Sequence, residues 1–224
     1  MIIAVSGGKG GVGKSTLSLN LGYELDAVVV DADLLAADLP VRTTGGPTLH
    51  EVLAGRVDPL DAVETVGAVR ILSCGQTLEG ARASILTDVP RVVERLRRRY
   101  GRVVIDCPAG LARDVGVCLH SADLAVLVTM PDRVALSDAA RTQSLAADVG
   151  TPVASIVLNQ CRDPVSDSLC DRVEATMGAP VVAIDRRAEL ASAQAAGRPL
   201  REQVPSSPVL DALESLTRLL ERCE

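Results

Sequence analysis

Eight residues near the start of the chain, Gly8-Lys9-Gly10-Gly11-Val12-Gly13-Lys14-Ser15, follow the pattern GxxxxGK[ST]. Glycines let a backbone wrap closely around a polyphosphate, so that successive N–H groups point at its oxygens. A lysine at the position of Lys14 can pair with the β- and γ-phosphates, and the Ser15 hydroxyl can ligate Mg²⁺. The segment follows an apolar run and opens a stretch of helical period, as this motif requires. It therefore predicts a site for a nucleotide with Mg²⁺, where Thr16 can contact the α-phosphate.

Lysine use singles out the same loop. The chain carries 23 basic residues, and only two of them, Lys9 and Lys14, are lysines. The phosphate-binding pattern explains Lys14 but leaves Lys9 without a function. A solvated loop lysine is the plain alternative for Lys9, although the chain uses lysine nowhere else on its surface.

The stretch KGGVGKST, residues 9–16, resembles the deviant phosphate loop of the MinD/ParA family of positioning ATPases, whose wider group includes the nitrogenase iron protein. In that family the extra lysine reaches across a nucleotide-sandwich dimer to the phosphates of the other subunit. The resemblance therefore implies ATP and Mg²⁺ as cofactors, a homodimer in the ATP state, and catalytic roles for Lys9 and Lys14.

Two acidic segments that follow predicted strands extend the resemblance. Asp31-Ala-Asp33 is similar to the family's switch I, whose second Asp orients the attacking water, and a carboxylate there can also contact Mg²⁺ through water. Asp106-Cys-Pro-Ala-Gly110 resembles the switch II signature DSPAG. The resemblance implies that Asp106 holds a metal-bound water and that the Gly110 amide senses the γ-phosphate. Capping of the strand ends is the alternative for Asp33 and Asp106.

Three further segments resemble the family. Asn159, at the end of a predicted strand, matches the family's adenine-reading Asn. Residues 130–141 resemble the MinD segment after the preceding strand, and residues 197–200 with 205–208 resemble the MinD C-terminal pattern. The resemblance thus covers nearly the whole chain.

The chain also departs from the family pattern. Asp38 stands where the family often has Asn, and Cys107 replaces the usual small Ser. Membrane-binding MinD proteins extend into a basic amphipathic tail. Here Pro208–Arg222 is expected to form a helix with an apolar stripe and an acid-rich polar face. That pattern favours packing on the sheet, so we expect no intrinsic membrane-targeting tail.

The elements that must position these residues alternate along the chain. Continuous apolar runs without alternation indicate strands buried on both faces of a parallel sheet, and segments of helical period lie between them. We expect a doubly wound α/β fold with a mostly parallel sheet of about seven strands, helices on both faces and one domain over residues 1–224. Ligands of such sheets bind beyond the carboxyl ends of the strands. The expected strands are 1–6, 27–31, 69–73, 102–106, 124–129, 152–158 and 180–184, and the expected helices are 15–24, 87–100, 134–149, 168–177, 187–196 and 208–222.

Charge and hydropathy limit the classes of partner. The 224 residues carry a net charge of −6, so broad nucleic-acid binding is disfavoured. An arginine cluster at positions 95–102 could contact phosphates, but it ends a predicted helix, where cations offset the helix dipole. No apolar run approaches the roughly 18 residues that span a bilayer, and we expect a cytoplasmic protein.

Cysteine and histidine positions predict little metal chemistry. The six cysteines include no CxxC pair and fit buried small hydrophobic residues best. Cys107 and Cys118 flank the switch II segment, which leaves a shared cluster between subunits open as an alternative. His50 and His120 have no ligand-like companions and are assigned no role.

The expected function is an ATP-driven dimerisation switch that positions a cellular complex such as a division, motility or chromosomal assembly. Slow hydrolysis, stimulated by a protein partner, would reset the monomer. Two alternatives stay open: an ATPase that delivers metal or an iron–sulfur cluster, and an adaptor that binds nucleotide but hardly turns over.

Overall fold

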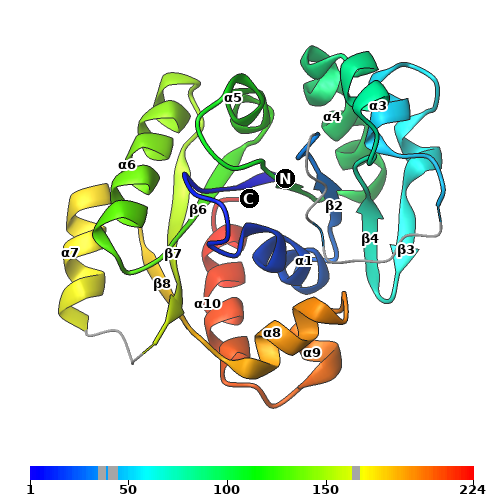
Figure 1. The fold of residues 1–224 in the computed structure, drawn as a ribbon. Coiled ribbons are helices and arrows are strands. Elements are labelled where there is room, and N and C mark those ends of the chain that lie inside the picture. Colours follow the sequence, from blue (N-terminus) through cyan, green and yellow to red (C-terminus); the bar gives the residue numbers. More distant parts are fainter. Residues whose placement is uncertain (35–38, 40–44, 163–166) are drawn as a thin grey trace.

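The computed structural model describes residues 1–34, 39, 45–162 and 167–224. These residues form an eight-stranded sheet in the order β3-β4-β2-β5-β1-β6-β7-β8 (Figure 1). All neighbouring strands pair in parallel except β3 and β4, which are antiparallel. The strands are β1 Ile2–Ser6, β2 Val28–Asp31, β3 Glu64–Val66, β4 Val69–Leu72, β5 Val103–Asp106, β6 Leu124–Thr129, β7 Val153–Cys161 and β8 Val181–Asp185.

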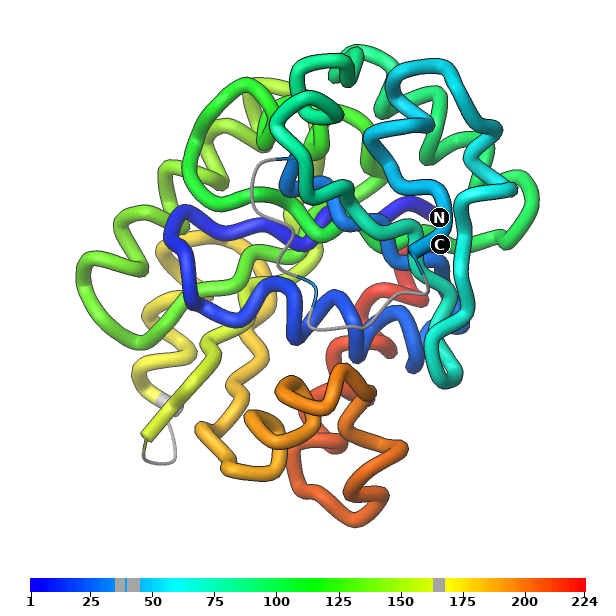
Figure 2. Tube along the Cα trace, turned by 45° about the vertical axis from the view of Figure 1, so that its right-hand side comes forward, coloured from blue at the N-terminus to red at the C-terminus, as the bar shows by residue number. Residues whose placement is uncertain are grey.

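Helices cover both faces of this sheet (Figures 1 and 2). One hydrophobic cluster joins one sheet face to α2, α4, α5, α6 and α7, and a second joins the other face to α1, α8, α9 and α10. The helices are α1 Lys14–Glu24, α2 Leu49–Leu53, α3 Leu78–Ala83, α4 Val89–Tyr100, α5 Arg113–His120, α6 Arg133–Asp148, α7 Asp167–Met177, α8 Ala188–Ala195, α9 Leu200–Gln203 and α10 Val209–Glu221, with short 3₁₀ turns at Pro59–Ala62 (η1) and Leu86–Asp88 (η2).

The apolar strands explain the two layers. In β1, Ile2 and Ala4 belong to one hydrophobic cluster, and Ile3 and Val5 belong to the other. Successive side chains of a strand point to opposite faces, so a strand covered on both sides must be apolar at every position. The predicted doubly wound α/β class is therefore confirmed.

The expected strands all occur, and the sheet gains one more. The added strand is β3, which pairs antiparallel with β4 at the sheet edge, through the register Glu64↔Ile71 and Val66↔Val69. Its three residues, Glu-Thr-Val, include no apolar run that could signal a buried strand. Four short helices, α2, α3, α5 and α9, were also not expected, because four to eight residues show too little helical period to be recognised.

The last helix, α10, packs as expected. Its buried side chains are Val209, Leu210, Leu213, Leu216 and Leu220. The Ser207 hydroxyl accepts a hydrogen bond from the Val209 amide (3.3 Å), so Ser207 caps the start of the helix across Pro208. Within the described ranges, none of the helices combines the length and hydropathy needed to traverse a bilayer.

Three arginines of the cluster on α4 are paired with acids. Arg97 and Arg98 both donate to Glu94 (2.6 and 2.9 Å), and Arg95 contacts Asp58 at 3.2 Å. These contacts fit the expected use of the cluster at a helix end better than a surface prepared for phosphates.

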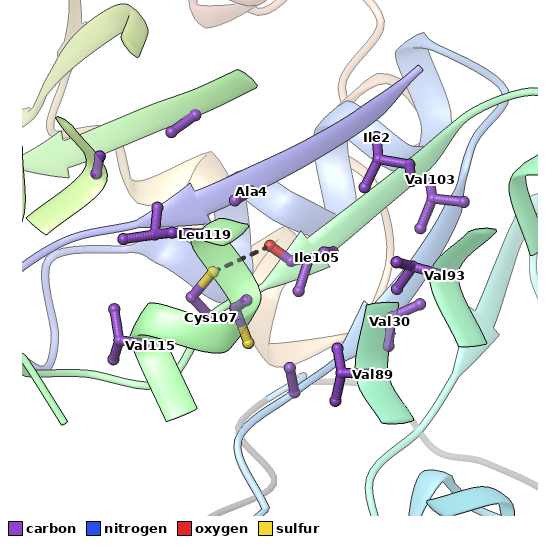
Figure 3. Close-up of a cluster of buried hydrophobic side chains, with 14 of the residues drawn as sticks. Ile2, Ala4, Val30, Val89, Val93, Val103, Ile105, Cys107, Val115 and Leu119 are labelled. Carbon is purple, nitrogen blue, oxygen red and sulfur yellow. Dashed lines mark hydrogen bonds between the residues drawn. The ribbon is translucent and has the colours of Figure 1, made fainter. Parts of the chain in front are cut away.

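Four of the cysteines are buried, as expected, at positions 74, 107, 118 and 161. Figure 3 shows Cys107 among Ile105, Val115 and Leu119, with its thiol donating to the Ile105 carbonyl at 3.8 Å. Burial and the neighbouring Cys118 thiol raise the pKa of Cys107 well above its ordinary value. Cys107 therefore packs as a small core residue. It stands at the position of Ser in the switch II signature, and its thiol is shielded from solvent.

Candidate functional site

The phosphate-loop segment joins β1 to α1 beyond the carboxyl end of the central strand. Gly11 and Gly13 adopt φ values of +77° and +102°, a left-handed conformation that favours glycine. Gly13 directly precedes α1, and the Leu17 amide donates to its carbonyl at 3.0 Å. The free amides at the start of this helix therefore lie at the end of the loop, where they can bind an anion.

Close neighbours explain three of the glycines. A Cβ added to Gly7 would lie 2.4 Å from the Val128 carbonyl oxygen, and one added to Gly8 would lie 2.6 Å from Asp138 Cβ on α6. A Cβ at Gly13 would lie 2.2 Å from Asn159 Nδ2. The loop is thus held against β6, α6 and β7, and only residues without a side chain fit there.

The tip of the loop is open. Among the described residues, no atom lies within 4 Å of a Cβ built on Gly10 or Gly11. Lys9 and Gly10 are exposed, whereas the Lys14 side chain is buried. The donor set, a buried ammonium beside backbone amides with space in front of them, fits a polyphosphate.

Asn159 and Gln160 clamp this loop from the end of β7. Asn159 Nδ2 donates to the Val12 carbonyl at 2.7 Å, and Gln160 Nε2 donates to the Gly11 carbonyl at 2.8 Å. Gln160 does so from a left-handed backbone, with φ +58°. Asn159, predicted from the resemblance to read a base, therefore contacts the phosphate loop through its amide nitrogen.

A cavity of about 190 Å³ lies beside Asn159. The phosphate loop and α1 contribute Gly13 and Thr16 to its wall, and β7 contributes Asn159 and Gln160. The remaining wall comes from the end of β8, the connection to α8 and α8 itself, with the residues Asp185, Arg186, Arg187, Leu190, Ala191 and Gln194. None of these six residues carries a sequence motif that predicts a place in the site. The rule that ligands bind beyond the strand ends of a doubly wound sheet could have pointed to the segment after β8.

The first turns of α1 hold Ser15 and Thr16 next to this cavity. Ser15 is half-buried and Thr16 is buried. The Asn20 side chain donates to the Thr16 carbonyl (2.8 Å) and accepts a hydrogen bond from the Leu200 amide (2.8 Å). This buried amide fixes the start of α1 to α9 on the outer layer.

Two buried carboxyl groups lie at the ends of adjacent strands. Asp31 of β2 pairs in register with Asp106 of β5, and Val5 of β1 pairs with Asp106 on the other side. The Ser18 hydroxyl of α1 donates to Asp106 Oδ1 at 3.1 Å. Asp106 therefore lies next to the strand from which the phosphate loop begins, as a carboxylate serving bound Mg²⁺ must.

Asp31 supports the turn that carries Asp33. Asp31 Oδ1 accepts a hydrogen bond from the Asp33 amide at 3.2 Å. Burial, and then the charge of Asp106, raise the pKa of the Asp31 carboxyl well above its ordinary value. Asp33 itself is half-buried. Asp38, the departure noted in this segment, lies outside the described residues.

Gly110 is half-buried and its neighbour Leu111 is exposed, in the segment between β5 and α5. Gly110 has φ +96°, and Leu111 is 46% exposed. Within the described part of the chain, no group of three or more His, Cys, Asp or Glu side chains is arranged to hold a metal by itself. Mg²⁺ bound together with a nucleotide usually takes one or two carboxylates plus phosphate oxygens and waters, which does not require such a group.

Comparisons with known proteins agree with this geometry. Residues 1–218 match the ParA family, described as NUBPL iron-transfer P-loop NTPase. An uncharacterized ATP-binding protein from Methanocaldococcus jannaschii is 31% identical over 230 residues, covering 98% of this chain and 88% of the relative.

Two solved structures are similar over their whole length. The cell division ATPase MinD of Pyrococcus furiosus has a TM-score of 0.89 at 28% identity, covering 100% of this chain and 99% of that one. The septum site-determining protein MinD of Pyrococcus horikoshii, complexed with Mg-ADP, has a TM-score of 0.87 at 26% identity, covering 100% and 98%.

Proposed function

Because the chain belongs to the MinD/ParA family of P-loop NTPases, we propose that it hydrolyses ATP and uses the nucleotide as a dimerisation switch. One observation carries the proposal. A buried Lys14 and an exposed Lys9 lie in the same glycine loop, at the strand end beside Asp106. Lys14 would serve the nucleotide of its own subunit, and Lys9 would reach outward.

ATP with Mg²⁺ is the proposed cofactor. Lys14 and the amides of residues 10–16 would hold the phosphates, while Ser15 and Asp106 would hold Mg²⁺, with Asp33 near it through water. The ion supplies positive charge against the triphosphate. The Mg-ADP bound to the Pyrococcus horikoshii relative supports this assignment.

The base is proposed to occupy the cavity beside Asn159. A nucleotide whose phosphates lie along Gly10–Thr16 must continue past Gly13 and Thr16, and both residues line that cavity. Asn159 gives its amide nitrogen to the Val12 carbonyl, so its carboxamide oxygen is the atom left to accept a hydrogen bond from an adenine amino group. Residues 185–194 would close the site around the base and ribose.

Lys9 is proposed to act in the second subunit of an ATP-bound homodimer. Its position on an open, exposed loop suits a contact with another molecule, whereas a lysine serving its own phosphates would fold inward as Lys14 does. Asp33 is proposed to orient the attacking water, from the turn that Asp31 supports. Gly110 would sense the γ-phosphate through its amide and change the switch II segment in the ATP state.

The output of the switch is proposed to be the positioning of a cellular complex, reset by a protein partner that stimulates hydrolysis. The similarity to a cell division ATPase supports cell division as the first process to examine. Over residues 1–224 we propose one ATPase domain that carries the nucleotide site and the dimer surface together.

Delivery of iron or an iron–sulfur cluster is the competing function, and the family description supports it. Cluster transfer between subunits needs thiolates at the surface. Cys107 and Cys118, the candidates beside switch II, are 2% and 0% exposed, which argues against them. Protein that stays colourless after anaerobic reconstitution with iron and sulfide would agree with the switch; a stable iron–sulfur absorption band that disappears in a Cys107→Ala variant would favour delivery.

A rate measurement tests the proposed activity. We expect slow, Mg²⁺-dependent release of phosphate from ATP by the parent protein and none from a Lys14→Ala variant. Nucleotide binding without any turnover by the parent would instead favour the adaptor alternative.

A further inference from the structure

His50 is the most deeply enclosed histidine of the described chain, at 2% exposure. It belongs to α2, whose start is fixed by a capping box: the Glu51 carboxylate accepts hydrogen bonds from both the amide and the hydroxyl of Thr48. The Leu49 amide also donates to the Ser73 carbonyl beyond β4 (2.8 Å). The imidazole is therefore held by a short helix that is anchored beyond the carboxyl end of β4. The candidate nucleotide site lies beyond the carboxyl ends of the same parallel sheet.

The ring contacts Leu34, the residue directly after Asp33. His50 Nε2 lies 3.1 Å from the Leu34 carbonyl oxygen and 3.5 Å from the Cys74 sulfur. A carbonyl oxygen only accepts, so Nε2 must carry the proton. His50 Nδ1 is then a bare acceptor, and among the described residues it has no hydrogen-bond partner.

Two glycines leave room for this ring. A Cβ at Gly75 would lie 2.2 Å from His50 Nδ1, and a Cβ at Gly80 would lie 2.5 Å from the same atom. Neither glycine has a positive φ, so close approach, and not backbone conformation, is the reason for glycine at both positions. The ring is thus confined to one place, with its Nε2–H group aimed at the Leu34 carbonyl.

The turn carrying Asp33 is consequently tied on both sides. On one side the Asp33 amide donates to Asp31 (3.2 Å), and on the other the Leu34 carbonyl accepts from His50 (3.1 Å). We infer that His50 is a positioning residue, which acts through the Leu34 carbonyl to hold Asp33 in the geometry needed for hydrolysis. This inference rests on the proposed ATPase function and adds to it a residue outside the phosphate loop and both switch segments.

Three variants separate the hydrogen bond from the packing. His50→Leu fills the same space with an apolar side chain of similar length and removes the Nε2–H donor. His50→Gln places an amide donor near the position of Nε2. His120→Leu, at an exposed histidine ending α5, is the matched control. We expect His50→Leu to lower kcat about tenfold, the effect of losing one buried hydrogen bond. KM should stay within about twofold, and His50→Gln should recover most of the rate.

Amide hydrogen exchange tests the contact without hydrolysis. In the ADP-bound state, His50→Leu should speed exchange in a peptide covering residues 28–34 and leave residues 124–129 of β6 unchanged. This result is expected even if the parent turns over no ATP, so it distinguishes a failure of the proposed function from a failure of the present inference.

Gly75→Ala offers a second route that keeps the histidine. The added methyl group must displace the imidazole, so it should lower kcat as His50→Leu does. Combined with His50→Ala it has room, and the effects should then be far from additive. Gly116→Ala, where the nearest atom lies at 4.0 Å, controls for the glycine replacement.

The inference is wrong if His50→Leu hydrolyses ATP at the parental rate with parental exchange in residues 28–34. It is equally wrong if His50→Gln loses as much rate as His50→Leu, since the donor would then have no part. Should His50→Leu fail to fold, additivity of Gly75→Ala and His50→Ala in a double-mutant cycle would overturn it.

Discussion

Asp31 and Asp106 lie opposite each other in the parallel pairing of β2 and β5, both almost without exposure to solvent. Each carboxyl group has a separate hydrogen bond, Asp31 with the Asp33 amide and Asp106 with the Ser18 hydroxyl. One acid thus supports the switch I turn, while its neighbour faces the helix that begins at the phosphate loop. Because the two carboxyl groups are buried side by side, the stability of the folded protein depends on their protonation and hence on pH.

The first prediction concerns that pH dependence. Because the pKa of Asp31 is raised in the folded protein, the folded state holds its proton more tightly than the unfolded state. The contribution of Asp31 to stability therefore falls as pH rises from its ordinary pKa of 3.8 toward the raised value. Asp31→Asn removes this penalty and keeps an oxygen for the Asp33 amide. Urea unfolding should show that the variant gains stability over the parent with rising pH.

Other acids titrate in the opposite direction; the pKa of Glu94, for example, is lowered to about 2 by the arginines beside it. These acids are the same in the parent and in Asp31→Asn, so their contributions cancel in the difference between the two free energies of unfolding. Asp211→Asn, at an exposed position of α10, controls for the loss of one carboxylate charge. A stability difference between the parent and Asp31→Asn that does not change with pH would contradict the assignment.

The second prediction concerns the close approach of the phosphate loop to β7. Gly13→Ala places a methyl group 2.2 Å from Asn159 Nδ2 on a backbone with φ +102°. We expect a loss of roughly 1–3 kcal/mol in the free energy of unfolding, measured without nucleotide. Gly10→Ala has open space and should change that free energy by less than about 0.5 kcal/mol. Equal effects of the two variants would show that Asn159 does not restrict the loop.

The third prediction tests the proposed base site. Ala191 lines the cavity beside Asn159, whereas Ala195 lies one helical turn further along α8 and does not. Ala191→Trp should fill the cavity and weaken ATP binding about tenfold or more, while inorganic tripolyphosphate binds as before. Ala195→Trp should bind both like the parent. Parental affinity for ATP in Ala191→Trp would place the base elsewhere.

The fourth prediction separates the two lysines. Lys14→Ala should abolish detectable ATP binding, because the buried ammonium is proposed to pair with the phosphates of the bound nucleotide. Lys9→Ala should bind ATP within about twofold of the parent but fail to form the ATP dimer, since its partner is proposed to be the other subunit. Titration with a fluorescent ATP analogue measures the first property and light scattering the second. Dimerisation of Lys9→Ala at parental ATP concentrations would remove the proposed contact between subunits.

The sequence predicted the fold through patterns that are local. The strand residues Ile2 to Val5 are apolar at every position, and the GxxxxGK[ST] pattern carries its own strand and helix context. Asp106 was found because it ends such a strand. The short edge strand at Glu64 has no comparable pattern, because one exposed face and three residues leave no periodicity to read.

The rest of the site depends on contacts between distant segments. His50 has no recognisable motif, since its partner is a backbone carbonyl at Leu34 and its space comes from Gly75 and Gly80. The cavity wall after β8 likewise becomes part of the site only when β7 and β8 pair beside the phosphate loop. Such relations follow from the topology and not from residue types.

Size-exclusion chromatography with light scattering, on the parent and an Asp33→Ala variant with Mg-ADP or Mg-ATP, tests the proposed switch most directly. We predict monomers with ADP, a dimer with ATP, and accumulation of that dimer in Asp33→Ala, because the variant should bind ATP but fail to orient the water whose attack ends the dimeric state. The same mass in every nucleotide state, for both proteins, would contradict the switch and favour the adaptor or the metal-delivery function.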